Sequence, residues 1–207
     1  MIDGHEYYRG KIMTVIMALV DYVPVLLFGI CAAILRRNQY EKMNKEIFAL
    51  LGSGTMMILT AGLFKATWKL LYAAGICDFE RLNQAFFPMQ SMGFFMAGIA
   101  ILITTFIPKK KSGTRLNAVA APAVFAGTAL FVSVMILGML GMCTGLAVQA
   151  KREGKKGAAV LFLISFLLMM TMGYLSSRDF TQSYVNWIAQ FVNIAGWSVF
   201  LAGVRKL

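Results

Sequence analysis

The feature that most constrains this chain is an apolar stretch of 31 residues from Glu46 to Ile76, interrupted in its last third by Lys65, Trp68 and Lys69. As an α-helix it would be about 45 Å long, more than the ~30 Å hydrocarbon core of a bilayer requires. One end can therefore reach the lipid headgroups, while Lys65 stays well inside the apolar run. We expect this segment to cross a membrane.

The rest of the chain has the same character. Hydrophobic residues make up 59% of it, charged residues 14%, and the mean hydropathy is +0.70. Soluble domains are less apolar and carry about a quarter charged residues. The sequence therefore predicts an all-α integral membrane protein, a helix bundle that fills residues 1–207 as a single polytopic domain in a lipid bilayer, with no soluble domain. The expected spans are residues 12–35, 47–76, 85–107, 117–149, 157–175 and 184–204.

The net charge of +11 does not indicate nucleic-acid binding, because of where the basic residues lie. They form short clusters between the apolar runs, at residues 36–45, 109–115 and 151–156. Such enrichment is typical of the loops of membrane proteins, where it is set by insertion and by attraction to anionic lipid. We expect anionic lipid headgroups at these loops, and no nucleic-acid partner.

Signatures of catalysis and of cofactor binding are missing from the sequence. His5 is the only histidine, and no Cys pair has metal-ligand spacing. The sequence has no phosphate-binding glycine loop, since Gly52-Ser53-Gly54 lies inside an apolar run and indicates close helix packing. We therefore expect no enzyme activity, no metal and no cofactor.

Two criteria, the length of the apolar runs and the distribution of charge, predict different numbers of spans. The run from Asn117 to Gln149 is short for two crossings, which favours six spans and puts Arg37 and Lys156 on opposite sides. With six spans, nine basic residues fall on each side; with seven, fourteen fall on one side and four on the other. The second count is a strong positive-inside pattern. We expect six spans by length and keep seven as the alternative.

A three-helix repeat is a further hypothesis. Gly29-Ile30-Cys31 and Gly141-Met142-Cys143 each precede a basic loop, and Asp-Phe follows the next apolar run in both halves. Small transporters are commonly built from internal repeats.

Asp21 is the most unusual residue of the first span, because a carboxylate near the bilayer centre costs about 2.5–3.5 kcal/mol. Pro24 predicts a kink near Val20. Depth counting along two antiparallel helices brings Asp21 within reach of Lys65, and Lys69 lies one turn further with Trp68 beside it. The alternative for the lysines is snorkelling to the interface, and for Asp21 a neutral, hydrogen-bonded acid.

The last span carries Asn186, Gln190 and Asn193 on one helix face. Such a stripe holds helices together or lines a pathway. We therefore expect a small permease or channel for a solute or ion, with Asp21, Lys65, Trp68, Lys69 and these three amides at its pathway. The alternative is a non-transporting sensor, adaptor or partner subunit that binds lipid, a signal or another membrane protein. The expected location is the plasma membrane, as a multi-pass protein. The possible partners are a second copy of this chain, in a homo-oligomer, and another membrane protein.

Overall fold

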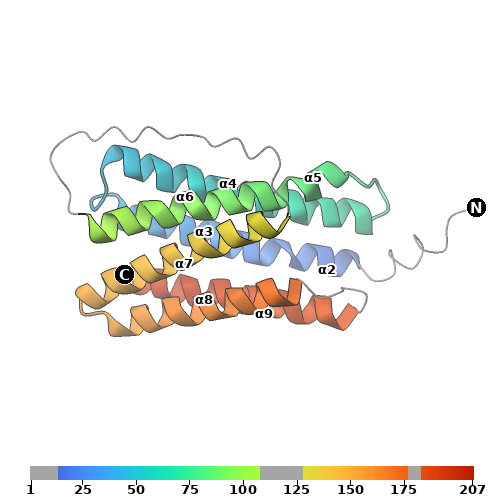
Figure 1. The fold of residues 1–207 in the computed structure, drawn as a ribbon. Helices are drawn as coiled ribbons and strands as arrows, with labels where there is room; N and C mark the ends of the chain where they lie inside the picture. The colour runs from blue at the N-terminus through green and yellow to red at the C-terminus, as the bar shows by residue number, and fades with distance from the viewer. Residues whose placement is uncertain (1–13, 108–127, 177–182) are drawn as a thin grey trace, which may run out of the picture.

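A computed structural model describes residues 14–107, 128–176 and 183–207. Within these ranges every regular element is an α-helix, so the prediction of an all-α bundle is confirmed (Figure 1). The helices are α2 (Val15–Val20), α3 (Tyr22–Gln39), α4 (Lys45–Ala73), α5 (Glu80–Gln84), α6 (Phe86–Phe106), α7 (Thr128–Arg152), α8 (Lys156–Ser176) and α9 (Ser183–Lys206).

Five helical stretches among the described residues are long and apolar enough to cross a bilayer: Val15–Gln39, Lys45–Ala73, Glu80–Phe106, Leu130–Arg152 and Tyr184–Lys206. The helix α8 is apolar but shorter in its fully described part, Lys156–Met172. The chain is thus a multi-pass membrane protein.

Several helices continue past the apolar runs that predicted them. The helix α3 ends at Gln39 and α9 at Lys206, with basic residues in the last turn of α3, α7 and α9. Cations at a helix C-terminus are favourable because they face the negative end of the helix dipole. Their long side chains can also lie along apolar surface while the charge stays in water.

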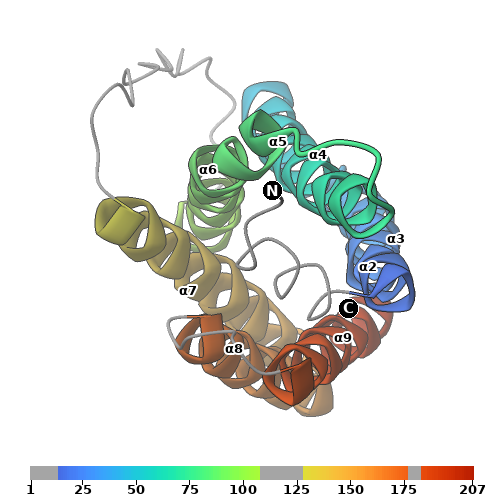
Figure 2. The ribbon, with the colours of Figure 1, turned by 90° about the vertical axis from the view of Figure 1, so that its right-hand side faces the viewer.

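The long helices form a closed ring in which each packs against two neighbours, in the order α3, α4, α6, α7, α8, α9 and back to α3 (Figure 2). The tightest packing joins α6 to α7. A Cβ atom on Gly98 would lie 2.2 Å from the carbonyl oxygen of Gly138, so only glycine fits there. Between α4 and α6, a Cβ on Gly54 would lie 2.7 Å from the Gly93 oxygen, which confirms that Gly54 serves close packing.

The helices α6 and α7 run in the same direction, although they are consecutive among the described long helices (Figure 1). Gly98 faces Gly138, and Thr105 bonds Gln149, so both helices finish at the same end of the bundle. The ends of α3 and α9 meet them there, through Gln39 and Val204. We call this the basic end and the opposite one the Asp21 end.

The observed directions correct one expectation. Arg37 and Lys156 were expected on opposite sides, and this is wrong: both lie at the basic end, where Lys42 and Glu153 form an ion pair. The cause is that α6 and α7 run in the same direction. By register, the start of α7 is level with the first turn of α6, about 27 Å along the bundle from the end of α6. Residues 108–127, which include the first part of the long apolar run, lie outside the described residues.

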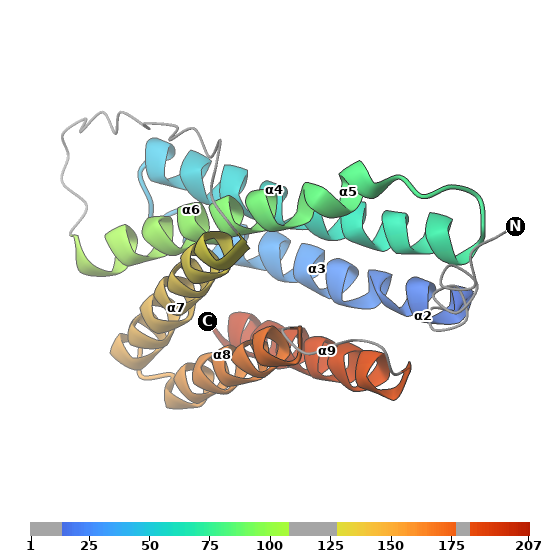
Figure 3. The same ribbon diagram turned by 45° about the vertical axis from the view of Figure 1, so that its right-hand side comes forward.

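The two halves of the ring have the same connectivity. The helices α3, α4 and α6 run toward, away from and toward the basic end, and α7, α8 and α9 repeat these directions. The helix α6 packs on α7 as α9 packs on α3. Figure 3 shows the first half above α8 and α9, with α7 crossing between them. This arrangement fits the three-helix repeat suggested by the sequence.

Candidate functional site

A break in the first span positions Asp21. The helix α2 ends at Val20 and α3 begins at Tyr22, so the helix is interrupted where the sequence predicts a kink. Pro24 has no N–H group, so it cannot donate to the carbonyl of Val20, and the helix is interrupted there. The Asp21 side chain is only 12% exposed.

The ion-pair partner of Asp21 is Lys69. Its Nζ lies 2.6 Å from Asp21 Oδ2, in a charge contact without the alignment of a hydrogen bond. The expected pairing of Asp21 with Lys65 is wrong by one helical turn. The 3.0 Å bond between the hydroxyls of Tyr22 and Thr67 fixes the same register. That register places the start of α4 about 8 Å beyond the end of α3, whereas depth counting assumed that both ended at one level.

Lys65 lies on aromatic rings of α6. Its Nζ is 3.9 Å from the ring centroid of Phe86 and 5.4 Å from that of Phe87. The ring face carries negative potential, which stabilises the ammonium group. None of the ion pairs formed by the described residues includes Lys65. Among the described residues, the membrane spans therefore carry two lysines and one carboxylate toward the Asp21 end.

Trp68 belongs to a different contact. Its Nε1 donates to Asp78 Oδ1 over 2.8 Å, and its ring stacks on Tyr72 at 5.9 Å. The bond joins the end of α4 to the segment before α5. The structure therefore brings Asp21 and Lys69 together and assigns Trp68 to a structural contact at the end of the helix.

The amides of α9 point into the ring. Gln190 is 6% exposed, and its Oε1 has no partner among the described residues. Asn186 and Asn193 are half-buried on the same face. Large exposed side chains mark the outer face of this helix: Tyr184, Ile188 and Phe191.

The register between α3 and α9 gives the depth of these amides. Asn38 Nδ2 donates to the carbonyl of Val204 over 2.9 Å, and the Cys31 thiol contacts the carbonyl of Trp197. Both pairs are 166 residues apart in sequence. The same offset puts Gln190 level with Pro24, about 4.5 Å deeper than Asp21. Gln190 therefore faces the interior just below the ion pair.

An aromatic layer closes the middle of the ring. The Trp197 ring lies 4.7 Å from that of Phe28, 5.6 Å from that of Phe200 and 6.3 Å from that of Phe94. Phe162 adds a contact at 5.4 Å to Phe200. All five side chains are buried, and they come from α3, α6, α8 and α9. Sequence reasoning missed this layer, although Trp197 and Phe200 continue the helical spacing of the amide stripe.

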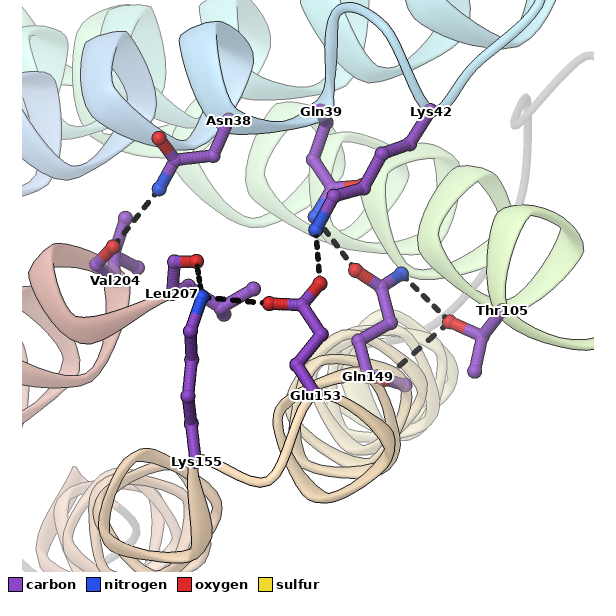
Figure 4. Close-up of polar contacts among 10 residues, drawn as sticks. Asn38, Gln39, Lys42, Thr105, Gln149, Glu153, Lys155, Val204 and Leu207 are labelled. Atoms are coloured by element: carbon purple, nitrogen blue, oxygen red, sulfur yellow. Dashed lines mark hydrogen bonds and ion pairs between the residues drawn. The ribbon is translucent and has the colours of Figure 1, made fainter.

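A hydrogen-bonded network lies at the basic end, below the aromatic layer (Figure 4). Gln39 Nε2 donates to Gln149 Oε1 over 2.7 Å, and Gln149 Nε2 donates to Thr105 Oγ1 over 2.8 Å. The Thr105 hydroxyl donates to the carbonyl of Ile101 over 2.7 Å. Gln39, Thr105 and Gln149 are buried and come from α3, α6 and α7. Nothing in their sequence spacing could have grouped them.

An ion-pair cluster covers that network on its exposed side. Glu153 accepts from Lys42 over 2.5 Å and from Lys155 over 2.7 Å (Figure 4). Partial burial alone would raise the pKa of Glu153, but hydrogen bonds from Lys155 and Lys42 outweigh it and hold this pKa below its ordinary value. Because Lys42 follows α3 and Glu153 follows α7, the cluster joins the two halves of the ring.

The interior is therefore polar at both ends and aromatic between them. Within the described residues, no group of three or more His, Cys, Asp or Glu side chains is placed to hold a metal ion. Comparison with family models, curated proteins and solved structures gives no match for this chain. The geometry of the site is therefore the basis for a functional proposal.

Proposed function

We propose that this protein is a small permease whose pathway enters at the Asp21 end and favours a solute with a negatively charged group. The observation that carries the proposal is the charge of the interior. Lys69 forms the ion pair with Asp21, whereas Lys65 has aromatic contacts and no carboxylate in ion-pair contact among the described residues. A cation held inside a membrane span without a counter-ion is costly, and such residues commonly mark a solute or ion pathway.

Two further features support a pathway. The inner face of α9 carries a buried Gln190 whose carbonyl oxygen is unpartnered, which is costly unless a solute or water bonds to it. The repeated connectivity of the two halves is the architecture in which many transporters place a central site between repeats. In this proposal the aromatic layer is the barrier, and the contacts between halves at the basic end must break before a solute can leave.

The orientation follows from charge. With the basic end in the cytoplasm, the basic clusters at residues 36–45 and 151–156 obey the positive-inside rule. The plasma membrane suits this arrangement, because its cytoplasmic leaflet is rich in anionic lipid.

The test is transport in proteoliposomes. We would record currents on a solid-supported membrane with chloride, nitrate, acetate and succinate gradients, for the wild type and for Lys65→Met and Lys151→Gln. We expect a saturable current with at least one of these anions, at least tenfold smaller in Lys65→Met per folded protein. The current should be unchanged in Lys151→Gln, which removes an exposed charge at the basic end.

The second candidate function is the non-transporting module, and one observation favours it: hydrogen bonds among the buried Gln39, Gln149 and Thr105 join three helices at the basic end. Thiol labelling separates the two. In a background with all three cysteines replaced by serine, Gln190→Cys should react with a water-soluble, membrane-impermeant sulfonate reagent if the pathway is hydrated. An unreactive Gln190→Cys together with no anion current would establish the non-transporting module.

A further inference from the structure

A second polar site lies on the outer surface of the bundle at the basic end, and the transport proposal does not use it. It is a pocket of about 570 Å³ where α3 turns into α4. Its lining includes Arg36, Arg37 and Lys42, with Tyr40 and Phe48 as aromatic walls. We propose that this pocket binds the phosphate of an anionic membrane lipid.

The guanidinium of Arg36 is held in place before any ligand arrives. It lies over the Phe48 ring at 5.5 Å from the ring centroid. It also lies flat over Gly52, where an added Cβ would be 3.7 Å from Arg36 Nη2. Its Nε is buried and has no acceptor among the described residues. A fixed guanidinium that lines the pocket suits a phosphate, because its planar fork can bind two oxygens at once.

The charges around the pocket leave a positive excess. The ammonium of Lys42 is taken by Glu153, and Glu41 adds one carboxylate to the lining. Arg36 and Arg37 remain as the cations that face the pocket. A monoanionic phosphate diester, the group shared by anionic phospholipids, matches this balance.

The position of the pocket favours a lipid over a soluble phosphate. Ala33 forms its membrane-side wall and is exposed. On the same face of α3, Ile30 is 47% exposed and Leu26 is 64% exposed. The residues at positions 26, 30, 33 and 37 are spaced by four, three and four, so they lie on one face of α3. An exposed apolar stripe therefore ends at the guanidinium of Arg37. A phospholipid can place its phosphate in the pocket and an acyl chain along this stripe. A free phosphate ion would contact only the pocket.

The experiment measures lipid binding by native mass spectrometry of the whole protein released from detergent, with phosphatidylglycerol and phosphatidylcholine titrated separately. We expect phosphatidylglycerol to bind more tightly to the wild type. Arg36→Gln should weaken this binding about tenfold, the effect of losing one charge-assisted contact. The matched control is Lys45→Gln, which removes an exposed charge at the same end but outside the pocket. It should weaken binding by less than about threefold, because an exposed charge is screened by salt.

A second variant keeps the charge and fills the space. Ala33→Trp should also lower the affinity about tenfold by blocking the wall of the pocket, and Arg37→Gln serves if Arg36→Gln does not fold. Equal losses in Lys45→Gln and Arg36→Gln, or full binding in Ala33→Trp, would overturn the site in favour of diffuse attraction.

The source of the phosphate is settled with two soluble probes. Inorganic phosphate and glycerol 3-phosphate, each at 10 times the lipid concentration, should leave phosphatidylglycerol binding unchanged. If either displaces the lipid in an Arg36-dependent way, the pocket is a site for a soluble phosphate and the lipid assignment is overturned.

Discussion

The ion pair between Asp21 and Lys69 gives the sharpest test of the interior. At 2.6 Å and an effective dielectric constant near 20, Coulomb attraction amounts to roughly 6 kcal/mol. Desolvation offsets part of it, because the two side chains are only 12% and 19% exposed. Removing one partner from a buried pair typically costs about 3–5 kcal/mol, because the other charge is left uncompensated.

The perturbation is a double-mutant cycle of Asp21→Asn and Lys69→Met, read as the free energy of unfolding in detergent. Each single substitution should destabilise the protein by about 3 kcal/mol. The value lies at the lower limit because both side chains keep some exposure. The double variant should recover about 1.5–3 kcal/mol of the summed loss, which is the coupling expected of residues in direct contact.

The matched control cycle replaces Lys69→Met with Lys65→Met. Lys65 contacts the Phe86 ring and forms no ion pair with Asp21, so its coupling to Asp21→Asn should be clearly smaller than that of Lys69, although the two charges still attract at longer range. Strong coupling of Asp21 to Lys65 and none to Lys69 would refute the register of α3 against α4 described above.

Three further predictions follow from the packing and the charges. Reporter fusions placed after Arg37 and after Lys156 should report the same side of the membrane, and opposite sides would disprove the parallel course of α6 and α7. Gly98→Ala should destabilise the protein by about 3 kcal/mol or more in thermal unfolding, because its Cβ would lie 2.2 Å from a carbonyl oxygen of α7, whereas Gly157→Ala, with nothing within 4 Å, should be nearly neutral. The stability difference between the wild type and Glu153→Gln should be full above the ordinary glutamate pKa of about 4.3 and disappear as the pH falls through the lowered pKa of Glu153. A difference that grows on acidification would show that the ion pairs do not stabilise the fold.

Hydropathy determined the class of this protein, because the cost of placing a segment in lipid is nearly a sum over its own residues. The interruption of the first span was also determined by its own residues. Pro24 lacks the N–H group that a continuous helix needs, whatever surrounds it. The inward stripe of α9 was visible as spacing, since Asn186, Gln190 and Asn193 lie on one face of any α-helix. These three features needed no knowledge of which helix packs on which.

The sequence predicted only in part which helix ends lie on the same side of the membrane. The charge count favoured a single basic end, and helix length favoured the opposite arrangement. The described helices share one basic end, because α6 and α7 run in the same direction. Length misled because the length of an apolar run does not show the direction of the helix that it contains.

Only the tertiary structure decided which polar groups meet. Asp21 contacts Lys69 because α4 starts beyond the end of α3, a displacement that depends on the packing of both helices. Gln39 and Gln149 are 110 residues apart in the chain, and they meet because α6 and α7 approach closely enough at their glycines for four helix ends to converge. Register and closest approach are properties of pairs of surfaces. A sequence read one segment at a time contains the surfaces but not their alignment, and that alignment fixes the site.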